Sequence, residues 1–223
     1  MNLDDPQLPR WLYLHGLGDH PVAAEPFLRL LRPHGTVWAP DLHGQPGGTP
    51  DDLANVALAS LPGDWQERGF QVIGHSSGPG GVQVAERTST CRQVVAGGSF
   101  TPTNAAGVGR FAGPDGQRVL LGALAGATDQ PPWPTRPTCA GCISRLHPPR
   151  RAPGRCLVLR PARFLQLEQL VVYIAGEHGA AADVTALQPV AATHVVPAGT
   201  HWVHLDQPAA VAALILQAWR APG

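Results

Sequence analysis

The stretch GHSSG, residues 74–78, decides how this chain is interpreted, because it fits the pattern G-x-S-x-G in a single register. The apolar run 70–73 precedes it, and a helix-compatible segment, 82–87, follows it. A sharp strand-to-helix turn of this kind exposes a serine above a sheet, next to amides at a helix N-terminus. The sequence therefore predicts Ser76 as a nucleophile. The alternative is a turn serine that bonds its own backbone.

The composition limits the class of protein. The chain has 223 residues, of which 43% are hydrophobic, and 16 arginines balance 16 acidic residues. This length suits one α/β domain, and zero net charge gives no electrostatic reason to expect nucleic acid or an anionic membrane as a partner. The absence of lysine excludes a Schiff-base lysine and a Walker lysine. With no secretory signal and no long apolar run, we expect a soluble, cytoplasmic protein.

Short apolar runs alternate with helical patterns along the chain. Continuous apolar runs without polar alternation favour strands buried on both faces of a parallel sheet. We expect such strands near residues 11–14, 36–39, 70–73, 94–96, 170–175 and 194–196. One helix is expected after Thr49, with Pro50 at its first position, and another after a capping Asp206, with Val211 and Ile215 on its apolar face. The predicted fold class is α/β, with a mostly parallel central sheet flanked by helices.

Residues 101–168 break this pattern. The segment 130–167 within them has no acidic residue but contains seven arginines and eight prolines. A stretch this long without secondary structure is uncommon inside a compact domain. We expect a single domain over 1–223 in which 101–168 form a cap or insertion. Partial disorder and a locally altered reading frame are the alternatives.

The four cysteines give little support for a disulfide framework or a metal site. Cys91, Cys139, Cys142 and Cys156 are too few and too unevenly spread for the former, so we expect reduced thiols. The pair Cys139-x-x-Cys142, followed by His147 and Cys156, is an allowed zinc ligand set. It lacks the second tight pair that makes such a prediction strong, so no metal and no cofactor are expected.

Three further motifs follow the apolar runs. The motif HGLG, residues 15–18, follows the first run, and PDLHG, residues 40–44, follows the second. The motif GTHW, residues 199–202, follows the last. The amides of Leu17 and Ser77 are then positioned to form an oxyanion hole for a nucleophile on the central turn.

With these motifs the chain resembles the α/β-hydrolase fold superfamily, and in particular its serine esterase-like and lipase-like members. The resemblance covers roughly residues 10–100 and 170–220, and it is more specific for the fold than for the substrate. It implies that Ser76 attacks an acyl carbon while His201 takes its proton as general base. The two oxyanion-hole amides would stabilise the resulting tetrahedral intermediate.

The third member of the triad has two candidates in the sequence. In this superfamily an aspartate usually follows the strand before the histidine, at the position where Gly179 stands here. Asp183 preserves the order Ser, Asp, His and is the acid we expect. Glu177 is the second choice, and a missing acid is the third possibility.

These observations predict a carboxylesterase-like enzyme that cleaves an ester or similar acyl bond of a small molecule through an acyl-enzyme. The alternatives are a catalytically inactive binding protein and a C–C bond hydrolase or lyase on the same fold. Among the remaining polar residues, His15, Asp19 and Asp41 are expected to order loops, and His204 and Asp206 to be structural. The sequence specifies neither a natural substrate nor an oligomeric state.

Overall fold

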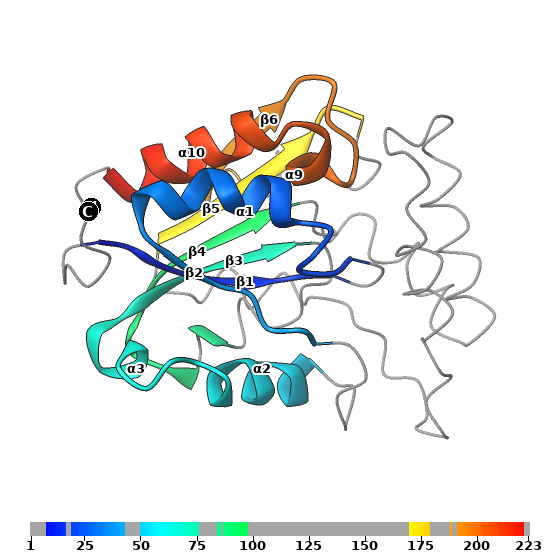
Figure 1. The fold of residues 1–223 in the computed structure, drawn as a ribbon. Helices are drawn as coiled ribbons and strands as arrows, with labels where there is room; N and C mark the ends of the chain where they lie inside the picture. The colour runs from blue at the N-terminus through cyan, green and yellow to red at the C-terminus, as the bar shows by residue number, and fades with distance from the viewer. Residues whose placement is uncertain are drawn as a thin grey trace, which may run out of the picture.

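The computed structural model describes residues 8–16, 19–42, 50–75, 84–85, 87–97, 170–178, 188 and 191–220. Within these ranges six parallel strands form one sheet in the order β2-β1-β3-β4-β5-β6 (Figure 1). The strands are β1 (Arg10–Leu14), β2 (Thr36–Trp38), β3 (Phe70–His75), β4 (Cys91–Gly97), β5 (Leu170–Gly176) and β6 (Ala192–Val196). Each corresponds to one of the apolar runs, so the predicted α/β class with a parallel sheet is confirmed.

Helices cover both faces of this sheet (Figure 1). One face carries α1 (Glu25–Leu31), the short 3-10 helix η1 (Arg32–His34), α9 (Val203–Asp206) and α10 (Pro208–Arg220). The other carries α2 (Pro50–Ala59) and α3 (Trp65–Arg68). The start of α2 at Pro50 agrees with the prediction. Within the described ranges, none of the helices has both the length and the apolar character needed to cross a bilayer.

The side chains of β1 explain why the strands are apolar throughout. Trp11 and Tyr13 are buried in the core that includes α1 and α10, whereas Leu12 and Leu14 are buried in the core that includes Trp65 of α3. A strand buried on both faces has no solvent-facing positions, and its sequence therefore lacks polar alternation. The sheet is thus rigidly packed, and its loops are where variation for function is expected.

The prediction that Asp206 caps the last helix is wrong. Asp206 is the last residue of α9, and α10 begins at Pro208. The carboxylate of Asp206 instead accepts hydrogen bonds from Thr200, in the turn before α9. The predicted apolar face is correct, because Val211 and Ile215 are buried against the sheet. The predicted cap or insertion, 101–168, lies outside the described residues.

Candidate active site

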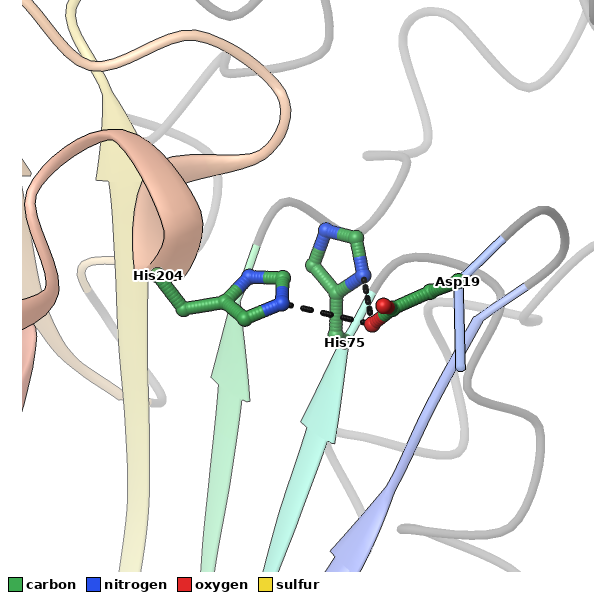
Figure 2. A group of neighbouring side chains, drawn as sticks. All are labelled: Asp19, His75 and His204. Carbon is green, nitrogen blue, oxygen red and sulfur yellow. Dashed lines mark ion pairs between the residues drawn. The ribbon is translucent and has the colours of Figure 1, made fainter. Parts of the chain in front are cut away.

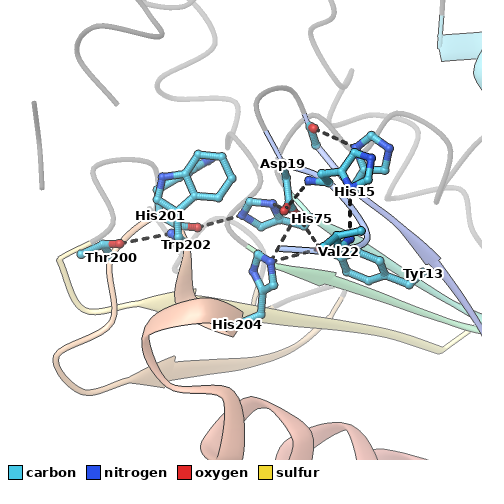
Figure 3. A network of polar contacts seen from close by, with 11 residues as sticks. Tyr13, His15, Asp19, Val22, His75, Thr200, His201, Trp202 and His204 are labelled. Atoms are coloured by element: carbon cyan, nitrogen blue, oxygen red, sulfur yellow. Dashed lines mark hydrogen bonds and ion pairs between the residues drawn. The ribbon is translucent and has the colours of Figure 1, made fainter. Parts of the chain in front are cut away.

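Three segments meet at the carboxyl edge of the sheet. They are the loop after β1 that contains Asp19, the end of β3 at His75, and the turn 197–202 between β6 and α9. Figure 3 shows side chains from these segments pointing toward one another. Ligands of open parallel α/β sheets bind at this edge, outside the carboxyl ends of the strands. We therefore take it as the candidate active site.

His75 links the central strand to the histidine turn. It is the last residue of β3 and is buried. Its Nε2 donates a hydrogen bond to the main-chain oxygen of His201 at 3.0 Å, and the centroids of the two rings are 5.1 Å apart. Because His75 directly precedes Ser76 in the chain, this bond connects the strand that leads to the predicted nucleophile with the turn that carries the predicted base.

The histidine turn is held on both sides of His201. A Cβ atom on Gly176 would lie 2.2 Å from the carbonyl oxygen of Thr200, so a glycine is needed for the turn to approach the end of β5 this closely. Asp206 Oδ2 accepts hydrogen bonds from the Thr200 amide at 2.7 Å and from its hydroxyl at 2.5 Å. The same hydroxyl oxygen accepts a bond from the Trp202 amide at 3.2 Å. These contacts fix the backbone of the turn that carries the His201 imidazole.

The environment of His201 keeps its imidazole neutral. The residue is only 7% exposed. Burial, followed by the charges of His75 and His204, lowers the pKa of His201 to about 3, although Asp19 opposes the shift. At neutral pH the ring is therefore neutral, with one of its nitrogens unprotonated.

A buried polar cluster lies beneath the turn and consists of Tyr13, Asp19, His75 and His204. All four residues are at most 4% exposed. Asp19 Oδ2 accepts a hydrogen bond from the Tyr13 hydroxyl at 2.5 Å, and it lies 3.4 Å from His75 Nδ1 and 3.3 Å from His204 Nε2 (Figure 2). The Tyr13 hydroxyl oxygen is also 3.0 Å from His204 Nε2. One carboxylate oxygen thus joins three segments that are distant in sequence.

Asp19 is ionised in this cluster. Burial favours its neutral form, but hydrogen bonds and charge interactions with His204 and His75 outweigh burial and hold the pKa of Asp19 well below its ordinary value. Burial, and then the negative charge of Asp19, raise the pKa of the Tyr13 hydroxyl. Tyr13 therefore keeps its proton and donates it to the carboxylate, as expected for a charge-assisted hydrogen bond.

The positions of the remaining protons follow from these contacts. Because the one Tyr13 proton points at Asp19, the phenolic oxygen accepts from His204, so His204 carries its proton on Nε2. The other ring nitrogen of His204 is buried and makes no hydrogen bond to any of the described residues, and burial is the main cause that lowers the pKa of His204. In His75, Nε2 donates to a carbonyl, while Nδ1 is buried, makes no hydrogen bond within the described residues and lies 3.4 Å from the Asp19 carboxylate. His75 is therefore the histidine of the cluster placed to form an ion pair with Asp19.

The same cluster could be considered as a metal site. One potential ligand atom comes from each of Asp19, His75 and His204, and these atoms lie within 4.8 Å of one another. Two imidazoles and a carboxylate are common ligands of zinc. Ligating histidines usually donate their second ring nitrogen to a partner, however, whereas His204 Nδ1 is buried without one. The hydrogen bond from Tyr13 further engages the carboxylate oxygen that would bind the ion. The geometry favours a hydrogen-bonded ion pair.

His15 orders the neighbouring loop, as predicted. Its Nε2 accepts a hydrogen bond from the Leu42 amide at 2.9 Å, and its Nδ1 contacts the Gly16 carbonyl oxygen at 3.2 Å. Asp41 lies 3.7 Å from the His15 ring and 3.4 Å from the His20 ring. The loops after β1 and β2 are therefore tied together beside the candidate site.

Most of the predicted catalytic groups fall outside the described residues. This applies to Ser76, Ser77, Leu17 and Asp183, and also to the cysteines and histidine considered as a zinc site, Cys139, Cys142, His147 and Cys156. His201 is described and lies at the expected edge of the sheet. The second-choice acid, Glu177, is exposed and accepts a hydrogen bond from the Ala198 amide at 2.9 Å. Within the described ranges its carboxylate makes no contact with His201.

The buried cluster is not predicted from the sequence, where Asp19 is expected only to order a loop and neither Tyr13 nor His75 is singled out. The available signal was the presence of polar side chains at the ends of runs that are otherwise apolar, because a buried polar group requires a partner. His75 is also the variable residue before the serine of the G-x-S-x-G pattern.

Comparison with known proteins identifies the class. A family model described as the alpha/beta hydrolase family matches residues 11–214. The match spans nearly the whole chain and includes β2 to β6 and all of β1 except its first residue, Arg10. The chain therefore belongs to the alpha/beta hydrolase family.

Solved structures of the same fold agree with this assignment. The chain is similar to 2-hydroxy-6-oxo-6-phenylhexa-2,4-dienoate hydrolase (BphD) from Rhodococcus sp. strain RHA1, with 19% identity, a TM-score of 0.61, and coverage of 97% of this chain and 92% of that one. It is similar to carboxylesterase CesB (YbfK) from Bacillus subtilis, with 17% identity, a TM-score of 0.68 and coverage of 97% and 85%. It is also similar to naproxen esterase from Bacillus subtilis, with 16% identity, a TM-score of 0.65, and coverage of 96% of this chain and 84% of that one. No curated protein matches the sequence significantly.

Proposed function

We propose that this protein is a serine hydrolase that cleaves an ester or similar acyl bond of a small molecule through an acyl-enzyme. Ser76 is the nucleophile, His201 the general base and Asp183 the acid that orients it. The amides of Leu17 and Ser77 form the oxyanion hole. No cofactor is needed for this chemistry.

The observation that carries this proposal is the hydrogen bond between His75 Nε2 and the His201 carbonyl oxygen, at 3.0 Å. It brings together two segments separated by 126 positions in sequence. One ends directly before Ser76, and the other carries an imidazole that is neutral at physiological pH. Nucleophilic acyl transfer needs a serine and a neutral imidazole, and this proposal places both at the carboxyl edge of the sheet.

The family and its members favour acyl-bond cleavage but leave the substrate open. Two of the similar structures are named as carboxylesterases or esterases, and one as a hydrolase of a dienoate. We propose an ester as the substrate class, since no contact in the described part of the chain favours C–C cleavage. A small-molecule substrate and a cytoplasmic location are parts of the same proposal.

The test is hydrolysis of short-chain nitrophenyl esters by the wild type and by two pairs of variants. Ser76→Ala and His201→Ala should each lower kcat by at least about 10⁴-fold while leaving the circular dichroism spectrum unchanged. Ser89→Ala and His34→Ala are the matched controls, because Ser89 lies in the turn before β4 and His34 in η1. A folded Ser76→Ala protein with wild-type activity would overturn the proposal. Activity on a vinylogous diketone but not on esters would reassign the substrate to C–C bonds.

A further inference from the structure

A second polar cavity lies at the opposite edge of the sheet, where the strands begin. It has a volume of about 230 Å³. Its walls include three arginines, Arg10 at the start of β1, Arg68 at the end of α3 and Arg92 near the start of β4, together with Gln71 and Trp219. In Figure 1 this is the side where α3 and the carboxyl end of α10 lie, away from the tips of the strand arrows. The cavity is therefore separate from the candidate active site.

The position of Arg92 is set by a β-bulge and by the close approach of Gly69. The register between β3 and β4 shifts between Phe70 and Gln71, so that Arg92 is the extra residue of a β-bulge. Its Nη2 donates a hydrogen bond to the Arg68 carbonyl oxygen at 3.0 Å. A Cβ atom on Gly69 would lie 2.7 Å from Arg92 Nε, and Gly69 has a φ of 83°. A glycine thus satisfies both the backbone conformation and the close approach of the guanidinium.

The other two arginines differ in their partners. Arg68 Nη1 donates to Asp64 Oδ2 at 3.0 Å, which balances one charge. Arg10 is only 9% exposed, yet its guanidinium has no hydrogen bond or ion pair within the described part of the chain. Burial, and then the positive charge of Arg68, lower the pKa of Arg10; the carboxylate of Asp64 opposes this shift, and Arg92 adds to it. A nearly buried cation beside two others is unfavourable unless an anion joins them.

We propose that this cavity binds a phosphate monoester, with the phosphate group between the guanidinium groups of Arg10, Arg68 and Arg92. Three arginines and one aspartate leave a net charge of two, which matches a phosphate monoester near neutral pH. Planar guanidinium groups donate paired hydrogen bonds to phosphate oxygens, and none of the residues that the structure describes occupies the donors of Arg10. Gln71 adds its amide nitrogen, since its oxygen already accepts from the Trp11 indole at 2.7 Å.

The size of the cavity favours a monoester over free phosphate. A volume of about 230 Å³ exceeds what one phosphate group fills, and the organic part of a small monoester fits in the remainder. Trp219 of α10 provides an aromatic wall for that part. The bound ligand would be distant from His201 and would not take part in the proposed hydrolysis, so the inference is independent of the catalytic assignment.

Isothermal titration calorimetry of the full chain with inorganic phosphate and with phenyl phosphate, at constant ionic strength, tests the proposal. We expect saturable binding with a Kd below about 1 mM, tighter for phenyl phosphate than for phosphate. Arg10→Gln and Arg92→Gln should each weaken binding at least about tenfold. Arg29→Gln is the matched control, because Arg29 is exposed and pairs with Glu25 on α1.

Two results would contradict the proposal. Equal affinity of the two ligands would overturn the assignment to a monoester, and an absence of binding, or binding unaffected by both cavity variants, would overturn the site itself. Thermal unfolding is a second measurement, and it separates a binding role of Arg10 from a structural one. Without phosphate, Arg10→Gln should have a Tm equal to or above that of the wild type, because it removes a repelled cation, and it should lose the increase in Tm that phenyl phosphate causes. If Arg10 had only a structural role, Arg10→Gln would instead lower Tm both without and with phenyl phosphate.

Discussion

The imidazole of His75 donates from Nε2 to the main-chain oxygen of His201, while its Nδ1 faces the Asp19 carboxylate at 3.4 Å. One side chain thus connects the loop after β1, the end of β3 and the histidine turn. These are the three segments that carry the predicted oxyanion hole, nucleophile and base. Their relative positions depend on a buried ion pair, so changes in that pair should affect both stability and activity.

Replacing only one member of the Asp19–His75 pair should lower the stability of the protein. His75→Gln leaves the Asp19 carboxylate buried without its imidazole partner, and we expect a loss of about 3 kcal/mol in the free energy of unfolding. Asp19→Asn removes the charge from the other side. In the double variant the two losses should be less than additive by more than about 1 kcal/mol, because the second change removes the group that the first left unpaired. Urea unfolding of all four proteins measures this coupling, and additive losses would show that the two residues do not interact.

The protonation of His204 is also predicted. The Tyr13 contact requires the proton on Nε2, and burial lowers the pKa of His204, so the ring should be neutral at pH 7 and carry its proton on Nε2. The nitrogen chemical shifts of the His204 ring distinguish this tautomer from the alternative. Tyr13→Phe should leave the ring neutral but weaken the preference for this tautomer. A doubly protonated His204 in the wild type would contradict the proton assignment within the cluster.

Stability should fall as the solution becomes acidic. The pKa values of His201 and His204 are lowered in the folded protein, so below about pH 6.5 the unfolded chain binds protons that the folded protein does not. Each residue then removes about 1.4 kcal/mol of stability per pH unit, until the pH reaches the folded pKa, which for His201 is about 3. Urea unfolding between pH 7 and about pH 5 measures the slope. His201→Gln should lower the slope by about 1.4 kcal/mol per pH unit at the acidic end of this range, and by less near pH 7. A wild-type stability that does not change over this range would refute the prediction.

Asp206 should position the histidine turn. Asp206→Ala removes the acceptor of both Thr200 hydrogen bonds, and we expect a loss of about 1–3 kcal/mol in stability. The larger effect should appear in kcat for ester hydrolysis and not in KM, because the turn holds the general base. Asp64→Ala serves as the control, because it also removes a carboxylate that accepts a hydrogen bond, but at the residue directly before α3. Equal effects of the two substitutions on kcat would show that Asp206 has no positioning role.

The sequence was sufficient to predict the sheet but not the cluster beneath the candidate site. Strands such as β1 and β3 are apolar because both of their faces are buried, and this property is local enough to be recognised from residues 11–14 and 70–73. The Asp19–His75–His204 contacts join residues far apart in the chain, and no local pattern encodes them. The same reason explains the error at Asp206. Its position before a helix favoured a cap, while its actual partner, Thr200, lies in the preceding turn.

The central claim is that Ser76 is an activated nucleophile. The most direct measurement is reaction of the full chain with a fluorophosphonate probe, followed by peptide mapping by mass spectrometry. The proposed mechanism predicts one covalent adduct, on Ser76, which is absent in Ser76→Ala, strongly reduced in His201→Ala and unchanged in Ser89→Ala. A folded wild-type protein that remains unlabelled, or one labelled at a residue other than Ser76, would contradict the claim.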